Sequence, residues 1–264
     1  LCESCAAVPP HLTFARKMYS EHLIAFIDIL GYSELVAQAD FEEVERCVRI
    51  FLDAFAARDP DQFLGRRTTY FSDTIVTTIP VAHPEHGHQP HGLLFHEIYA
   101  LCLAQAELFD RLGVIVRGGL TVGDLIHDET RIFGPGVIQA YMLEQRASFP
   151  RIVVDRRLFT RYFADRALVA AHHIRRSQDY GYIRPLMYRE ANGDRSVDYL
   201  GQALYNLDDP DYYPVFLKKH RDAIRGGLGH QSSSVRAKYL WLNRYHDHTV
   251  RKIMKPELQQ ELLV

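Results

Sequence analysis

Residues 23–33 read LIAFIDILGYS, an apolar run interrupted by one aspartate and followed by a glycine. The run predicts a buried strand over residues 22–29, with Asp28 near its end. A second aspartate, Asp73, lies in TTYFSDTIVTTI, which predicts strand, turn and strand over residues 68–80. A charged side chain that closes a buried strand is costly unless a cation or a hydrogen-bond network receives it. The two aspartates are therefore candidate ligands for divalent metal ions.

Composition limits the class of protein. The chain has 264 residues, 47% apolar and 24% charged, with a net charge of −2. Such a chain forms one large domain, or one domain and an appendage. The balanced charge favours neither nucleic acid nor an anionic membrane as a partner, and no uninterrupted apolar run is long enough to span a bilayer. Four cysteines do not suggest a disulfide scaffold, so we expect a soluble, cytoplasmic protein.

Helical and strand patterns alternate along the rest of the chain. Helical spacing predicts one or two helices over residues 34–57, then helices over 93–112, from Pro135 onward, and over 156–165. Strands are expected over 114–134, turning near Gly123-Asp124 with a bulge at Gly118-Gly119, and over 151–155, and as a hairpin of 182–189 with 197–200. HPEHGHQPHG reads as an exposed loop.

This order predicts an α/β (α+β) fold of the split βαβ, ferredoxin-like type, with a mixed or antiparallel sheet flanked by helices. We expect an N-terminal arm over residues 1–21, a catalytic domain over 22–205 and a helical extension over 206–264. The extension contains two basic helices, 211–227 and 235–254, and its charge is typical of solvated helix faces.

Three segments together resemble the class III nucleotidyl cyclases. FIDILGYS resembles that family's metal-binding first strand, and Ser72-Asp73-Thr74 falls at its second metal aspartate. LTVG, GPGV and AYMLE, at residues 120–123, 134–137 and 140–144, look like its glycine-containing strand and the helix that follows. The resemblance covers roughly residues 22–200 and implies a cyclase fold, in which Asp28, Asp73 and the backbone carbonyl of Ile29 hold two Mn²⁺ or Mg²⁺ ions.

The chain departs from the purine cyclases at the positions that read the base and stabilise the transition state. Thr69 occupies the place of the base-reading lysine, and Arg131 replaces its acidic partner. Ile138 and Met142 align with the usual Asn and Arg. Two explanations follow: a catalytically silent cyclase fold that binds nucleotide and regulates a partner, or a divergent cyclase with a different base and other stabilising groups.

The combined motifs most closely resemble the pyrimidine cyclases of the bacterial Pycsar anti-phage system. The resemblance implies conversion of UTP, or alternatively CTP, to the 3′,5′-cyclic monophosphate, with a separate effector protein as the target of the product. A purine cyclase is the enzymatic alternative. The resemblance also implies a homodimer with its active sites in the interface, where one chain supplies Asp28 and Asp73 and its mate supplies the 131–146 region.

Further site residues are candidates only. The backbone N–H groups from Leu30 through Gly31 and Tyr32 to Ser33, at the start of a helix, suit a triphosphate. Thr69, Tyr70 and Arg131 are candidates to face the base. A cation beyond the metals is needed at phosphorus, and the candidates are Arg117, Arg131 and Arg146. The alternatives are that Asp28 caps a helix, Asp73 is a turn residue, and Arg117 and Arg131 are edge or solvated residues.

Overall fold

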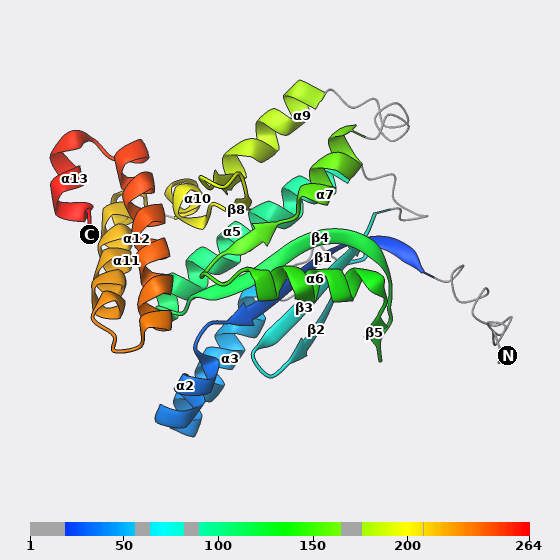
Figure 1. Cartoon of the computed structure of the whole chain (residues 1–264), viewed down its shortest axis with the longest axis horizontal. Helices are drawn as coiled ribbons and strands as arrows, with labels where there is room; N and C mark the ends of the chain where they lie inside the picture. Colours follow the sequence, from blue (N-terminus) through cyan, green and yellow to red (C-terminus); the bar gives the residue numbers. More distant parts are fainter. Residues whose placement is uncertain (1–18, 56–63, 82–89, 165–175, 208) are drawn as a thin grey trace, which may run out of the picture.

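The computed structural model describes residues 19–55, 64–81, 90–164, 176–207 and 209–264. Most of the predicted arm, most of the His-rich loop and the segment 165–175 lie outside these ranges. Within them the chain forms an eight-stranded sheet flanked by helices, with strand order β2-β3-β1-β4-β6-β8-β7 and β5 paired to β4 (Figure 1). Every pairing is antiparallel except that of β4 with β6, so the predicted α+β fold with a mixed sheet is confirmed.

The strands follow the apolar runs of the sequence. Their bounds are β1 Ser20–Ile29, β2 Arg67–Phe71, β3 Thr74–Pro80, β4 Val116–His127, β5 Ile132–Phe133, β6 Ile152–Val154, β7 Met187–Arg189 and β8 Arg195–Val197. The long strand β1 lies between β3 and β4 and is nearly covered on both faces, which explains its run of apolar residues.

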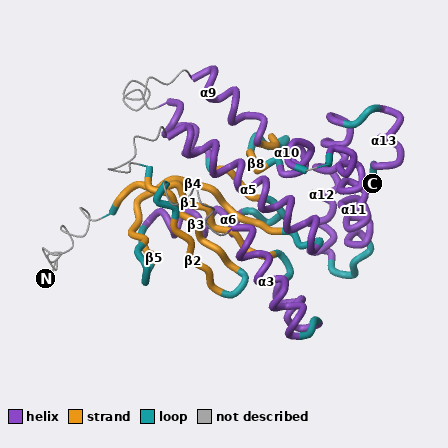
Figure 2. Tube along the Cα trace, turned by 180° about the vertical axis from the view of Figure 1, so that it is seen from behind, coloured by secondary structure: helices purple, strands orange, loops and turns teal. Residues whose placement is uncertain are grey.

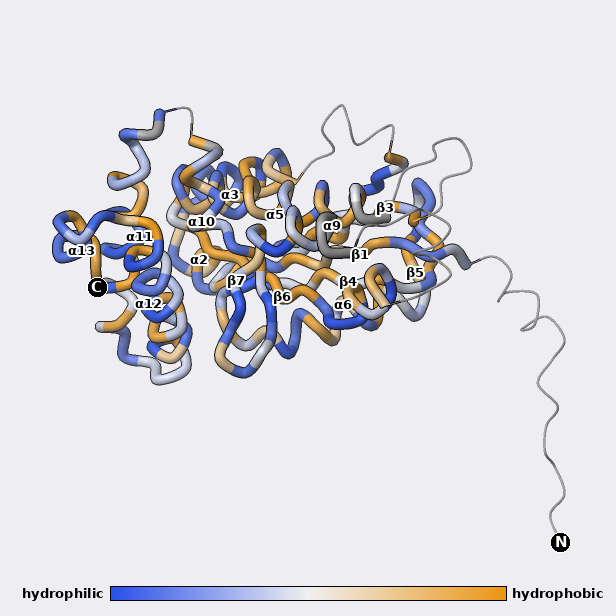
Figure 3. The backbone as a smooth tube through the Cα atoms, turned by 90° about the horizontal axis from the view of Figure 1, so that it is seen from above, coloured by the Kyte–Doolittle hydropathy of each residue, from blue (hydrophilic) through white to orange (hydrophobic). Residues whose placement is uncertain are grey.

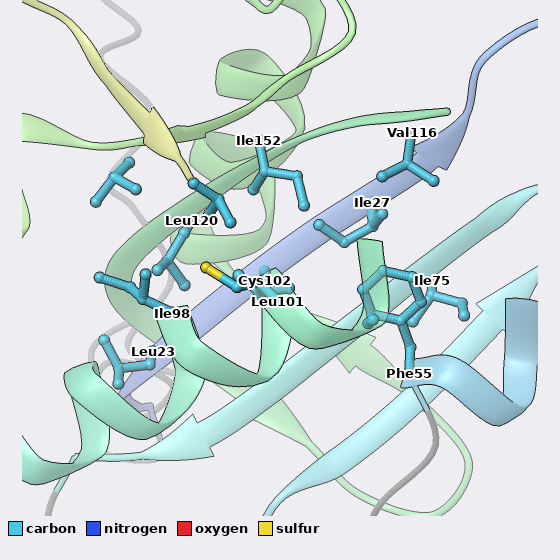
Figure 4. Close-up of a cluster of buried hydrophobic side chains, with 14 of the residues drawn as sticks. Leu23, Ile27, Phe55, Ile75, Ile98, Leu101, Cys102, Val116, Leu120 and Ile152 are labelled. Atoms are coloured by element: carbon cyan, nitrogen blue, oxygen red, sulfur yellow. The ribbon is translucent and has the colours of Figure 1, made fainter. Parts of the chain in front are cut away.

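Alternation along β1 gives the sheet two different faces. Leu23, Ala25 and Ile27 belong to the main core, together with helices α3 (Phe41–Phe55) and α5 (Pro90–Leu112). Figure 4 shows this core between the strands and α5. Ile24 packs instead with Ala140 of α6 (Pro135–Arg146). Figure 3 shows α3 and α5 on one side of the strands and α6 on the other. By the same alternation, Asp28 lies on the α6 face.

Helix α5 is the central core helix. Residues Gly92–Leu112 are long and apolar enough to cross a membrane by length and composition, but 61% of the relevant window is buried inside the protein. A buried core helix passes the same test, so this is weak evidence for a membrane span. The buried Glu97 of α5 pairs with Arg66 at 3.1 Å and accepts a hydrogen bond from Thr77 at 2.9 Å.

Helix α6 runs antiparallel to β4 and lies unusually close to it. A Cβ atom on Gly119 would come within 2.8 Å of Leu143, and one on Gly123 within 2.8 Å of the backbone of Gly136. Only glycine allows this approach, because any side chain would push the helix away from the sheet. Gly119 and Gly123 therefore position α6, and with it Glu144.

The C-terminal helices form a second core at one end of the sheet (Figure 2). These are α10 Tyr199–Asn206, α11 Tyr213–Leu228, α12 Ser233–Ile253 and α13 Pro256–Leu262. Their buried side chains pack with Ala106, Phe109 and Ile115 of the α5 region. At the centre, His220 contacts both the hydroxyl of Tyr199, at 2.6 Å, and Nδ1 of His246, at 3.1 Å.

Several predicted boundaries were wrong. Strand β4 passes straight through Gly123-Asp124 and turns only at residues 128–131, and its register with β1 has no bulge at Gly118-Gly119. Gly119 and Gly123 allow the approach of α6, whereas a Cβ on Gly118 would collide with Phe26 and Ile27 of β1. The predicted hairpin of 182–189 with 197–200 is shorter than expected. Residues 182–183 end helix α9 (Arg176–Ile183), and Arg184–Leu186 form a 3₁₀ turn. Residues 199–200 begin α10. Pro185 suits that 3₁₀ turn and not a strand. Of the one or two helices predicted over 34–57, the structure has two, α2 (Tyr32–Gln38) and α3.

Candidate functional site

Asp28 lies on the α6 face of β1, directly across from Thr74 of β3 on one side and Arg117 of β4 on the other. Its carboxylate accepts a hydrogen bond from Nε of Arg117 at 3.0 Å and a longer one from the hydroxyl of Thr74 at 3.4 Å. Burial raises the pKa of Asp28, Arg117 lowers it, and the negative charge of Asp73 raises it again, so the pKa is raised overall.

Asp73 comes to the same place because β2 and β3 form a tight hairpin. Ser72 in the turn adopts the left-handed conformation, with φ of 55°. The carbonyl of Asp73 accepts a hydrogen bond from the N–H of Ile29 at 3.0 Å, which ties the turn to the end of β1. The Asp73 side chain is close enough to raise the pKa of Asp28 both by its charge and by a hydrogen bond.

Glu144 is a third carboxylate at this site, and the sequence analysis did not assign it a role. Its Oε1 lies 2.7 Å from Nε of Arg117, and its side chain is only 1% exposed. Within the described chain that oxygen has this ion pair but no hydrogen bond. Burial raises the pKa of Glu144, Arg117 lowers it, and the charges of Asp28 and Asp73 raise it. The sequence pattern contained a sign of this position, because Glu144 falls one turn after Ala140, on the inward-facing side of α6.

Two of the three acids, Asp28 and Glu144, therefore share one guanidinium, and Asp73 lies beside Asp28. Arg117 carries a single positive charge against Asp28, Asp73 and Glu144, so negative charge is in excess at the end of β1. Carboxylate oxygens without nitrogen or sulfur ligands are the donor set of hard divalent cations, and Asp28 and Asp73 fit such an ion. Across the described ranges, no group of three or more His, Cys, Asp or Glu side chains is arranged around one metal position.

The expected phosphate-binding backbone directly follows β1. Leu30 donates its N–H to the carbonyl of Ile115 at 2.9 Å, so it is not free for a ligand. Gly31 is left-handed, with φ of 85°, and is the N-cap of α2, which begins at Tyr32 and has no side-chain cap. Ser33 lies in the exposed first turn of that helix.

Thr69 and Tyr70 of β2 separate onto opposite faces of the sheet. Thr69 is paired with Val76 and lies on the α6 face, where its hydroxyl contacts Nε2 of His127 at 2.7 Å. Tyr70 is paired with Ile75, a residue of the main core, and is exposed beside the other face. His127, which the sequence analysis missed, also contacts the Thr78 hydroxyl through Nδ1 at 2.8 Å.

The two remaining arginine candidates lie away from the carboxylates. Arg131 follows the far end of β4, where it pairs with Asp128 at 2.8 Å and lies over the ring of Phe133. Eleven strand steps separate the two ends of β4, or about 36 Å. Arg146 ends α6 and lines a separate cavity of about 300 Å³ with Arg151, Asp155 and Asp194 among others. Of the three arginines, only Arg117 is brought to the aspartates.

Comparison with known proteins found similarity at the level of structure. No family model matches the chain, and no curated protein matches its sequence. The adenylyl cyclase CyaB from P. aeruginosa is similar at 14% identity and a TM-score of 0.44, over 58% of this chain and 82% of that one. The monomeric guanylyl cyclase domain of the RhoGC fusion protein from the aquatic fungus Blastocladiella emersonii is similar at 12% identity and a TM-score of 0.41, over 68% and 95%. Similarities at this level assign no role to any residue of this chain.

Proposed function

We propose that this protein is a nucleotidyl cyclase of the class III type, which converts a nucleoside triphosphate to its 3′,5′-cyclic monophosphate and pyrophosphate. The observation that carries the proposal is the proximity of Asp28 and Asp73, two carboxylates from separate segments at the end of one strand. The motifs around both aspartates support it, because each lies in a segment that resembles the metal-binding parts of that family.

Asp28 and Asp73 would hold two Mg²⁺ or Mn²⁺ ions, together with the carbonyl of Ile29. When bound, such ions supply Lewis-acid stabilisation of phosphate charge and make a nearby hydroxyl more acidic. Arg117 favours the ionised form of Asp28 and holds it in position through its hydrogen bond, and Glu144 in turn orients Arg117. The N–H groups of Tyr32 and Ser33 are available to triphosphate oxygens at the opening of α2.

The distances within one chain support a homodimer with shared sites. Arg131 lies about 36 Å along β4 from Arg117, too far for one substrate to contact both. A second copy could bring its own Arg131 or Arg146 to Asp28. The α6 face also exposes several large apolar side chains that a second copy would bury: Phe71, Ile138, Tyr141 and Met142.

The substrate we favour is a pyrimidine nucleotide, UTP before CTP. Position 69 carries a threonine, and its hydroxyl is held by His127. A short hydroxyl can serve as donor or acceptor to the polar edge of a small base, whereas a purine-reading lysine is absent. By resemblance to the pyrimidine cyclases, the product would act on a separate effector in anti-phage defence.

The deciding experiment incubates the full chain with each of the four ribonucleoside triphosphates and Mn²⁺ and identifies the products by mass. We expect cyclic UMP, or cyclic CMP, with release of pyrophosphate. A cyclic purine product would overturn the pyrimidine assignment alone. Binding of a triphosphate with no cyclic product from any of the four would instead favour a silent, nucleotide-binding domain.

A further inference from the structure

A second cavity, of about 750 Å³, lies at the β7 edge of the sheet. The end of α9, the 3₁₀ turn before β7, the β7–β8 hairpin and the last part of α12 form it. Strand β7 is the edge strand and lies four strand positions from β1, or about 19 Å across the sheet. The cavity is therefore separate from the carboxylate site.

Two arginines face each other across the hairpin. Arg189 of β7 and Arg195 of β8 are direct cross-strand partners and both line the cavity. Like charges at directly opposite positions of an antiparallel pair destabilise it. The guanidinium of Arg195 lies over the Phe159 ring, 4.5 Å from its centroid, which holds the charge in place without neutralising it.

Two more cations complete the lining. Arg184 comes from the 3₁₀ turn and Lys252 from α12, and both are exposed. In the described part of the chain none of these four cations forms a salt bridge. His248 lies beside them, with its ring 5.3 Å from that of Tyr188.

Among the described residues a single carboxylate lines the cavity, and it already has hydrogen-bond partners. Asp198 is buried and accepts hydrogen bonds from the hydroxyl of Tyr245, at 2.8 Å, and from the N–H of Gly201, at 3.1 Å. Among the described lining residues, four cations against this one anion leave an excess of three positive charges in a concave site, where the potentials of neighbouring charges add up.

We propose that this cavity is a binding site for a small phosphorylated molecule. Arginine presents a planar fork of donors that suits phosphate oxygens, and three of the four cations are arginines. The volume accommodates either an inorganic polyphosphate or a nucleotide. The proposal does not rest on the cyclase assignment, because it uses none of the residues of that site.

The sole tryptophan of the chain reports on this site. Trp241 lies 6.3 Å from the ring of Tyr188, which lines the cavity. We would titrate the full chain in EDTA, which keeps divalent ions away from Asp28 and Asp73, and follow Trp241 emission, corrected for ligand absorbance. The probes are inorganic pyrophosphate, UMP and citrate. We expect saturable changes in emission with pyrophosphate or UMP. Whichever of the two binds more tightly shows whether the site takes an inorganic polyphosphate or a nucleotide.

The matched variants are Arg189→Ala combined with Lys252→Ala, and the control Arg157→Ala, an exposed arginine outside the cavity. The double variant should bind the phosphorylated probe at least tenfold more weakly, whereas Arg157→Ala should bind as the parent does. All the changed side chains are exposed, so circular dichroism should show the fold retained. The absence of a saturable change, equal binding by the double variant, or equally tight binding of citrate would each overturn the proposal.

Discussion

The guanidinium of Arg117 donates from Nε to the carboxylate of Asp28 at 3.0 Å, directly across the β1–β4 pair. The same nitrogen lies 2.7 Å from Glu144 on α6. One arginine thus connects the end of the central strand, with the proposed metal ligand Asp28, to the helix that covers it. Its position makes the proposed catalytic site and the stability of the α6 face depend on the same side chain.

Asp28→Asn and Asp73→Asn should each lower the rate of cyclic nucleotide formation by at least a thousandfold, because each removes a charged ligand from the proposed metal site. The fold should persist in the Asp28 variant, because burial disfavours the charged form of Asp28 and raises its pKa. The neutral asparagine does not carry this cost of burying a charge. Initial rates and thermal melts of both variants would be measured beside Asp124→Asn, an exposed aspartate on β4. Turnover within tenfold of the parent in either variant would exclude the metal assignment.

Arg117→Met should destabilise the protein by about 3 kcal/mol, because it leaves Glu144 buried without its ion-pair partner. Urea unfolding would measure the loss. Adding Glu144→Gln to the same chain removes the unpaired buried charge. The double variant should therefore recover most of the free energy of unfolding, while its cyclase activity stays low. Equal destabilisation in the single and double variants would show that the pair does not act as a unit.

His127 should give the protein a distinct stability loss in mild acid. Burial, with the nearby charges of Arg67 and His22, lowers its pKa from 6.5 to about 4. Between pH 4 and 6.5 His127 is protonated in the unfolded chain but not in the folded one. The free energy of unfolding therefore falls as the pH drops from 6.5 to 4. Outside that window the contribution of His127 is constant. The shift corresponds to about 3 kcal/mol at most.

The measurement for His127 compares unfolding free energies of the parent and of His127→Gln from pH 7.5 to 4. His22, His220 and His246 also have lowered pKa values, so only the difference between the two curves isolates His127. The difference should shrink as the pH falls below 6.5. Parallel curves over the whole range would rule out a depressed pKa at this residue.

Two neighbouring glycines of α11 should respond in opposite ways to alanine. A Cβ on Gly227 would collide with the ring of Tyr239 on α12, whereas one on Gly226 meets nothing within 4 Å. We expect Gly227→Ala to cost about 1–3 kcal/mol through overpacking and Gly226→Ala to be neutral or stabilising by up to about 1 kcal/mol. Melting temperatures of the two variants test the packing of α11 on α12. A similar shift in both would mean that the two helices are not in close contact there.

Shared sites can be tested by mixing inactive chains. A chain with Asp73→Ala retains its own 131–146 region, and a chain with Arg131→Ala and Arg146→Ala retains both aspartates. If each site takes the aspartates from one chain and the arginines from its mate, every mixed dimer has one intact site of two. An equal mixture should then regain up to about a quarter of the parent activity, because about half of its dimers are mixed. The single preparations must first be inactive. A mixture no more active than its components would argue that each chain works alone.

Much of the fold follows from local patterns. The run LIAFIDIL is buried as the central strand, and TTYFSDTIVTTI forms a hairpin around Asp73, as its alternation and turn residues predict. The predicted element boundaries were wrong where a glycine can serve either a turn or a close contact with a helix. Gly123 reads as a turn by itself, yet it lies in mid-strand because α6 needs the space above it. That need depends on a helix thirteen residues later, which local turn chemistry does not see.

Local patterns predict most of the elements and single out the two aspartates, because strand periodicity and turn residues act over a few neighbouring positions. Which charges meet depends on how the elements pack. Arg117 and Glu144 join Asp28 because β4 pairs with β1 and α6 folds back over it, whereas Arg131 is carried to the far end of the same strand. The basic cavity likewise combines α9, the β7–β8 hairpin and α12. Electrostatic interactions depend on distance in space, and the packing of the chain sets that distance.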